Sequence, residues 1–153
     1  MAHGVLALMT GVLQEWEAAI AEARTALALN PNSPFVMGIL GRMLCGGRHY
    51  EEAINQLRRA LHASPHDPLT WAWTAFLAHS QFGSRDFAAA LESCRRVIRS
   101  RPSLAWAHEH FAASLGHLER LDEAREALER ARAQFPEHFQ RYQHRPPWRH
   151  IED

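Results

Sequence analysis

Apolar residues recur along this chain at the three- and four-residue spacing of an amphipathic helix, and the same arrangement returns four times. The first set is Trp16, Ala19, Ile20, Ala23, Ala26 and Leu27. Equivalent sets begin at Tyr50, Phe87 and Leu121, and Arg125 and Arg132 interrupt the fourth. Each segment extends for roughly 14 residues and ends before a proline, which cannot continue the helical hydrogen bonds. The pattern therefore predicts four amphipathic helices that repeat one another.

The repeat has a period of 34 residues, with one longer step of 37 between Pro65 and Pro102. Residues of the same kind occur at positions one period apart, and we interpret them as structural repeat positions. They are Trp16, Ala19, Pro31, Tyr50, Ala53, Ala60, Pro65, Phe87, Ala90, Pro102, Leu121, Ala124 and Pro136. A fixed period of roughly 20 to 50 residues is the sequence signature of a stacked repeat architecture.

A second apolar segment of helical period precedes each of the last three sets, at about residues 34–46, 68–82 and 104–117. Turn-forming residues separate the two segments of each pair, as in Gly46-Gly47. Small residues stand where paired helices must approach, as at the structural position Gly41 opposite Ala53. Each unit is therefore predicted to be a helix, a short turn and a second helix.

The third unit is three residues longer than the others, and its first helix can be aligned in two ways. One alignment is based on Trp71, and the other starts three residues later on Thr74 with Leu77 and Ala78. The sequence leaves both alignments open.

The second unit resembles the tetratricopeptide repeat in Gly41, Tyr50-Glu-Glu-Ala53-Ile54, Ala60-Leu61 and Pro65. The resemblance covers residues 3–136 and implies an all-α fold, an α-α superhelix of about four helix-turn-helix units with a short C-terminal tail. We expect a single domain over residues 1–143, with units at about 1–33, 34–67, 68–104 and 105–138, and an irregular tail over 144–153. In such a right-handed solenoid the first helices of the units line a concave groove.

A narrower similarity concerns the C-terminal repeat region of bacterial adenylate or guanylate cyclases of class III. It rests on Ser64-Pro65-His66-Asp67-Pro68, on Arg120-Leu121-Asp122-Glu123-Ala124 and on Arg145-Pro146-Pro147-Trp148. No segment resembles the catalytic domain of those enzymes. The similarity implies a shared module and, as an alternative function, a regulatory or oligomerising segment of a nucleotide cyclase or a related signalling protein.

Composition narrows the classes of function. The 153 residues suffice for one domain, and 17 acidic residues balance 17 basic ones, so the net charge supplies no field for a nucleic acid or an anionic membrane. Every basic residue is arginine, which excludes lysine Schiff-base and phosphate-loop chemistry. The apolar run from Gly4 to Leu13 is too short to span a membrane, and no Lys or Arg precedes it as in a signal peptide. Cys45 and Cys94 indicate a reduced compartment, the cytoplasm.

Neither metal binding nor catalysis is expected from the remaining motifs. His62 and His66 straddle Pro65, and His108 and His110 point to different faces of a helix. No glycine-rich phosphate loop, Gly-x-Ser-x-Gly motif or His-Glu-x-x-His motif occurs. A basic cluster on a second helix lies on the predicted outer wall, at Arg95, Arg96, Arg99 and Arg101. We therefore expect a non-enzymatic protein with no cofactor, no metal and no nucleic-acid partner.

Protein recognition in the groove is the function that these observations favour. The candidate peptide- or protein-binding side chains point away from the partner helix and are Phe35, Arg42, Phe76, His79, Trp106, Glu109 and His117. Aromatic rings beside arginine and histidine suit a docked peptide or helix. Alternatively, Phe35 and Trp106 fill gaps between units. The groove lacks the paired Lys and Asn with which tetratricopeptide grooves clamp the C-terminal carboxylate of chaperones, so that role is not expected.

The N-terminal edge is a second candidate surface. Its apolar residues are Leu6, Leu8, Met9 and Leu13. The last unit differs, because Arg125 and Arg132 stand at two of its apolar positions and we expect them to be exposed to solvent. The N-terminal edge has no comparable charged residues. Terminal repeats need polar caps because each unit shields only its neighbour. We therefore expect another chain, a preceding domain or a second copy in a homo-oligomer to cover this edge.

Overall fold

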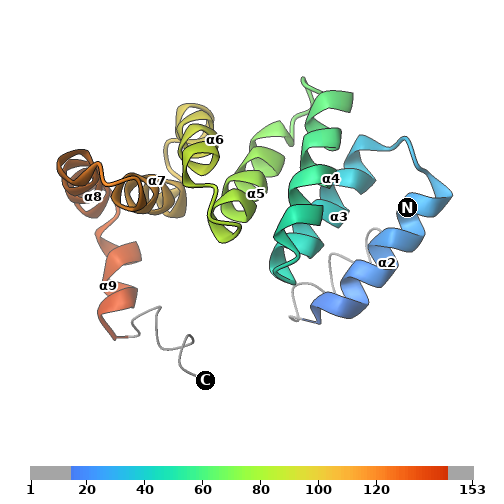
Figure 1. Ribbon diagram of the computed structural model, residues 1–153, viewed down its shortest axis with the longest axis horizontal. Helices are drawn as coiled ribbons and strands as arrows, with labels where there is room; N and C mark the ends of the chain where they lie inside the picture. Colours follow the sequence, from blue (N-terminus) through green and yellow to red (C-terminus); the bar gives the residue numbers. More distant parts are fainter. Residues whose placement is uncertain (1–14, 145–153) are drawn as a thin grey trace.

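The computed structural model describes residues 15–144, which form eight helices and no strand (Figure 1). The helices are α2 (Trp16–Leu29), α3 (Pro34–Gly46), α4 (Tyr50–Ala63), α5 (Thr70–Gly83), α6 (Phe87–Ser100), α7 (Ala105–His117), α8 (Leu121–Gln134) and α9 (Pro136–His144). Those from α3 to α8 form three pairs joined by short turns. The fold is all-α, as the hydrophobic pattern predicts.

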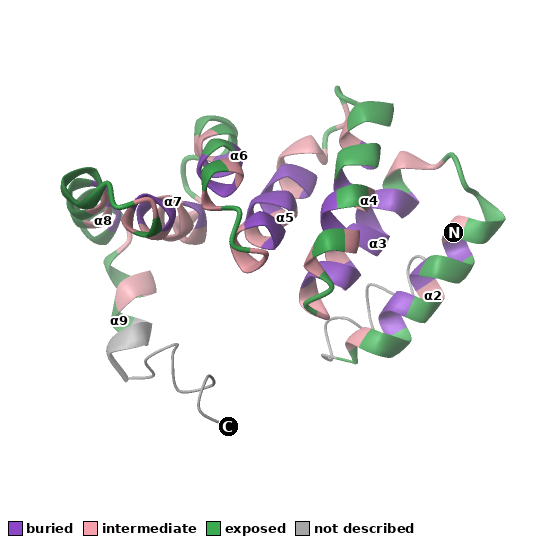
Figure 2. Cartoon of the chain, in the orientation of Figure 1, coloured by how far each residue is buried: buried purple, intermediate pink, exposed green. Residues whose placement is uncertain are grey.

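The helices stack in chain order into a superhelix. Each helix packs against the next, and α3 also contacts α5, while α5 contacts α7. These contacts place the first helices of the units together on the inner side of the curve. Figure 2 shows burial concentrated where helices face one another, and α8 is mostly exposed. The predicted α-α superhelix of helix-turn-helix units is confirmed.

The turns within the three pairs share one geometry. Each contains a non-glycine residue in the left-handed region, with φ of 64°, 66° and 61° at Arg48, Arg85 and Glu119. In the first turn the N–H of His49 donates to the carbonyl of Leu44 at 2.9 Å, which is the long bond of a Schellman motif. The N–H groups of Asp86 and Arg120 make the equivalent bonds in the other turns. The two helices of each pair therefore meet in the same way.

Aromatic residues at the start of second helices pack onto the end of the following first helix. The Trp16 ring lies over Gly46, and the Tyr50 ring lies over Gly83. A Cβ atom at either glycine would overlap the ring. Glycine at these two positions is thus required by the close approach of an aromatic ring.

The structure decides the alignment of the third unit. The turn from Gly83 to Phe87 has the same length as the turn from Gly46 to Tyr50, whereas the connection from α4 to α5 is longer than the one from α2 to α3. The extra residues of the third unit therefore lie in the connection before α5 and at the start of α5. Thr74, Leu77 and Ala78 take the buried positions, with 9%, 6% and 0% exposure, whereas Trp71 is only half-buried.

The core divides into one large and two smaller clusters. The large one joins α2 to α5 and contains side chains that are at most 1% exposed, among them Ile20, Leu40, Met43, Leu44 and Leu57. The smaller ones are centred on Leu115, between α6, α7 and α8, and on Val97, between α5, α6 and α7. The most extensive packing therefore lies in the N-terminal half of the described chain.

Small residues allow the helices of the large cluster to meet closely. A Cβ on Gly41 would overlap the Leu57 side chain. Ala53 and Ala60, on the facing helix, are 0% and 1% exposed. A larger residue at any of these positions would overpack the contact between α3 and α4.

The alanines at the first repeat position of each second helix are buried, except in the last unit. Ala19 and Ala90 are fully buried, as Ala53 is, whereas Ala124 is half-buried and Leu121 is 55% exposed. The equivalence of Leu121 with Trp16, Tyr50 and Phe87 does not extend to its packing, because its side chain stays exposed although α9 follows and contacts α8. Arg125 and Arg132 are exposed.

The proline of the last unit also differs in its position from the other three repeat prolines. Pro31, Pro65 and Pro102 lie in the turns between units, whereas Pro136 is the first residue of α9, where a missing N–H costs no helical bond. Helix α9 continues to His144, so helix occupies the first residue of the predicted irregular tail. The predicted first helix of unit one, the N-terminal edge and residues 145–153 lie outside the described residues.

Candidate functional site

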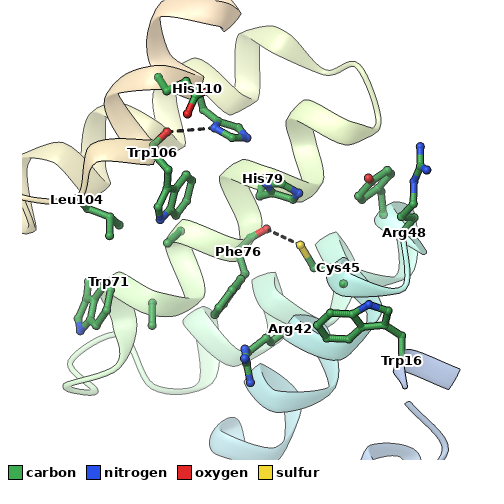
Figure 3. Close-up of a pocket in the computed structure, with 15 residues that line it drawn as sticks. Trp16, Arg42, Cys45, Arg48, Trp71, Phe76, His79, Leu104, Trp106 and His110 are labelled. Carbon is green, nitrogen blue, oxygen red and sulfur yellow. Dashed lines mark hydrogen bonds between the residues drawn. The ribbon is translucent and has the colours of Figure 1, made fainter. Parts of the chain in front are cut away.

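A pocket of about 740 Å³ opens on the inner side of the superhelix (Figure 3). It lies between α3, α5 and α7, and α5 contributes more of its lining than any other helix. Rings make up much of this lining: Trp16, Tyr50, Trp71, Phe76, His79, Trp106 and His110. The site is thus an apolar, aromatic hollow on the face that the first helices form.

Five of the seven candidate binding residues line the pocket. Phe76 and His79 stand on α5, Arg42 on α3, and Trp106 and Glu109 on α7. These residues are up to 67 positions apart in the sequence, from Arg42 to Glu109. The superhelix brings them together because equivalent faces of the first helices are stacked side by side.

Phe35 and His117 lie outside the pocket. Phe35 is 37% exposed and contacts the edge of Trp73, with ring centroids 6.3 Å apart. His117 stands at the end of α7 and packs on Phe87. Phe35 thus contacts a residue of the next unit, and neither Phe35 nor His117 lines the pocket. Trp106 combines both roles, because it lines the pocket and packs beside the cluster of Val97.

Sequence reasoning missed several lining residues. Trp16 and Tyr50 were interpreted only as repeat positions, but each ring also faces the pocket. Trp71 belongs to the lining as well, and the guanidinium carbon of Arg101 lies 4.7 Å from its ring centroid. Large aromatic residues at the start of a second helix were the signal that could have identified the first two.

Two histidines form a neutral pair inside the site. The ring centroids of His79 and His110 are 5.1 Å apart. Burial lowers the pKa of His79 to about 4, with a smaller effect from His110. Burial also lowers the pKa of His110, against a hydrogen bond in which its Nδ1 donates to the Trp106 carbonyl at 3.0 Å. At neutral pH both rings are therefore uncharged and contribute to the apolar lining.

The charged residues of the pocket are unevenly placed. Arg42 holds its guanidinium 5.6 Å from the centre of the Phe76 ring, a cation–π geometry. Glu109, on α7, is 3.0 Å from the Nε2 of His138, and both side chains are about one quarter exposed. This contact joins α9 to α7. The carboxylate of Glu109, which sequence analysis proposed as a binding group, thus has a partner within the chain.

The thiols of the described residues are inert. Cys45 and Cys94 are free and buried, and burial raises the pKa of Cys45 and raises that of Cys94 to about 12. The Cys45 thiol donates to the Phe76 carbonyl at 3.7 Å. Thiolate, the reactive form, is therefore suppressed at neutral pH.

Residues 15–144 lack the features of two other classes of site. No group of three or more His, Cys, Asp and Glu side chains there could hold a metal ion. None of the helices in that range combines the length and the apolar character needed to cross a membrane.

Two family models match the chain. The model described as anaphase-promoting complex, cyclosome, subunit 3 matches residues 47–131, more than half of the sequence. The model described as tetratricopeptide repeat matches residues 11–68. Neither match supports the similarity to nucleotide cyclases, which is not maintained. No curated protein matches the chain.

Solved structures with the same fold are similar over most of the chain. MamA from Desulfovibrio magneticus RS-1, residues 41 to the end, superimposes with a TM-score of 0.77 at 16% identity and covers 88% of this chain and 75% of that one. A MamA RS-1 double mutant gives 0.79 at 17% identity, with 94% and 79% covered. A chain of the APC/C hetero-tetramer Cut9–Hcn1 gives 0.81 at 19% identity and covers 89% of this chain but 27% of that one. At these identities the likeness concerns the fold alone.

Proposed function

Because the chain belongs to the tetratricopeptide repeat family represented by the subunit 3 model, we propose that it is a protein-interaction module that holds a peptide or protein segment in its inner groove. Repeats of this type are typical of protein–protein interaction modules. The finer proposal concerns the surface that is used, namely the pocket between α3, α5 and α7. The proposed module comprises residues 1–143 and binds without catalysing a reaction.

The observation that carries this proposal is the convergence of Arg42, Phe76, His79 and Trp106 on one pocket. All four side chains are half-buried, so each still offers surface to a partner. Large rings with few rotatable bonds provide contact area at a low entropic cost, and such rings dominate the energy of many interfaces. A single side chain of a partner peptide, inserted between these rings, would bury enough apolar area to anchor it.

The chemistry of the pocket is that of recognition. Its thiol is protonated and its histidine pair is neutral at neutral pH. No cofactor is needed for the function that we propose. A similar fold occurs in a complex of two proteins, Cut9 and Hcn1, which favours a protein as the partner here. Two buried free thiols suit a reducing compartment such as the cytoplasm.

Selection from a displayed library of random peptides tests the proposal. The wild-type chain is compared with the double variant Phe76→Ala/Trp106→Ala, which removes two pocket rings. The matched control is Leu29→Ala/Leu121→Ala, which removes two exposed apolar side chains outside the pocket. Circular dichroism and thermal unfolding establish that each variant is folded.

We expect the wild type and the control to retain the same peptides and the Phe76→Ala/Trp106→Ala variant to lose them. Equal retention by all three proteins would show that binding occurs elsewhere. If none retains a peptide and light scattering gives a mass larger than one chain, self-association replaces groove binding as the function.

A further inference from the structure

The Arg42 end of the pocket holds a positive charge that has no negative partner among the described residues. Within residues 15–140 the close contacts of carboxylates with basic side chains involve other arginines or histidines, and neither Arg42 nor Arg48 takes part in one. Arg48 also lines the pocket and is exposed. The positive charge of Arg42 also acts on the buried Cys45 thiol, because it lowers the pKa of that thiol while burial raises it.

The acidic side of the pocket does not neutralise this charge. Glu109 is the acidic residue in the lining, and its Oε2 lies 3.0 Å from His138, at the α7 side. The neighbouring His79 is neutral at neutral pH. Within the described part of the chain the Arg42 guanidinium at the α3 side of the pocket is thus unpaired, and a carboxylate is the group that complements it.

The position of Arg42 beside Phe76 also indicates which ligand group should lie next to the carboxylate. Its guanidinium carbon lies 5.6 Å from the centre of the Phe76 ring, and Figure 3 shows Arg42 and Phe76 turned toward one another, with Trp106 farther along the same hollow. A cation–π contact uses the charge of the guanidinium and leaves its N–H groups able to donate paired hydrogen bonds to a carboxylate. A ligand that bonds to these N–H groups places its neighbouring side chain against the rings.

From this arrangement we propose that the groove selects a peptide segment in which an aspartate or glutamate lies within two residues of a large apolar side chain. The carboxylate accepts hydrogen bonds from Arg42, and the apolar side chain inserts between Phe76 and Trp106. The recognised carboxylate belongs to a side chain within the segment, so a free C-terminus is not needed. This inference rests on the proposed groove function and specifies its partner.

A positional-scanning library of ten-residue peptides, acetylated at the N-terminus and amidated at the C-terminus, tests the inference without terminal charges. We expect the wild type to retain peptides enriched in Asp or Glu within two residues of Trp, Phe, Leu or Ile. The best peptide is then resynthesised with Asn or Gln in place of the acid. Its affinity for the wild type should fall about tenfold, the loss of a hydrogen bond to a charged group.

Arg42→Gln is the matching protein variant, and Arg58→Gln, on the exposed face of α4, is the control with the same change in net charge. In Arg42→Gln the acidic enrichment should disappear while the apolar enrichment remains, and exchange of Asp for Asn in the peptide should no longer matter. Arg58→Gln should behave as the wild type. Thermal unfolding verifies that both variants are folded.

The two proposals fail in different ways. Retained peptides that carry no acid, or an acidic preference that survives in Arg42→Gln, would overturn the acidic-peptide inference while leaving groove binding in place. A library from which the wild type retains nothing would overturn both.

Discussion

The imidazole of His117 stacks on the ring of Phe87, with the ring centroids 4.1 Å apart and the planes 5° from parallel. In the two preceding pairs of helices the position of His117 is occupied by glycine: the Trp16 ring lies over Gly46, and the Tyr50 ring lies over Gly83. The contact between successive units is therefore an aromatic ring over a glycine in two places and a pair of stacked rings in the third. His117 belongs to this contact and lies outside the pocket.

Replacing His117 by alanine removes the stack. We expect the free energy of unfolding to fall by about 0.5 to 1.5 kcal/mol, the usual range for an aromatic pair, with no change in peptide binding. Urea denaturation measures the first effect and the peptide assay the second. The control is His66→Ala, an exposed histidine in the turn after α4, which should leave both unchanged. Weaker peptide binding in His117→Ala would return this residue to the binding surface.

Two glycines of the first helices should respond to alanine in opposite directions. Gly83→Ala forces a Cβ into the Tyr50 ring and should destabilise the chain by about 1 to 3 kcal/mol. Gly116→Ala meets nothing within 4 Å, and it should stabilise α7 by up to about 1 kcal/mol through helix propensity. Chemical denaturation of both variants decides the matter. A Gly83→Ala protein as stable as wild type would contradict the packing of Tyr50.

Two buried serines differ in their hydrogen bonds. The Ser93 hydroxyl donates to the side-chain carbonyl of Gln81 at 2.7 Å between α6 and α5. The Ser114 hydroxyl is fully buried and has no partner among the described residues. Ser93→Ala should cost about 1 to 3 kcal/mol because the Gln81 carbonyl is left unpaired, whereas Ser114→Ala should be neutral or stabilising. Equal losses in thermal unfolding would show that Ser114 has a partner.

The histidine pair should make stability depend on pH. In the unfolded chain His79 takes up a proton near its ordinary pKa of 6.5, but in the folded protein only near 4. Between these values the unfolded state binds more protons, so the free energy of unfolding decreases as the pH falls from about 6.5 toward 4. His110 acts in the same direction.

The variant His79→Gln isolates this contribution from that of the carboxylates. Urea denaturation of wild type and variant at several pH values gives the difference between them. As the pH falls through this range, the free energy of unfolding of the wild type should decrease more than that of His79→Gln. A difference that is constant with pH would show that the folded protein does not keep His79 uncharged.

Prediction from the sequence was most successful for the helices. The sets that begin at Trp16, Tyr50, Phe87 and Leu121 correspond to α2, α4, α6 and α8, each of which starts at that residue. The reason is that helical spacing, turn residues and prolines act over a few residues and are visible in any short window. The period extends this local information to the order of stacking.

Contacts between distant residues were harder to predict. The position of Glu109 on a predicted helix places it in the groove, but its contact with His138 depends on where α9 packs. Phe35 has a similar position in the pattern and instead meets Trp73 of the next unit. Such contacts join different units, and their geometry follows from the curvature of the stack.

The sequence by itself determined that the chain is a helical repeat protein, because the repeating pattern of apolar and small residues is compatible with one way of stacking helices. Tertiary structure alone decided that the third unit is aligned on Thr74, that Trp16 and Tyr50 face the pocket, and that Arg42 meets Phe76 there. The physical reason is that a helix is stabilised by neighbours along the chain, whereas a pocket forms from side chains that become neighbours only after the units have packed.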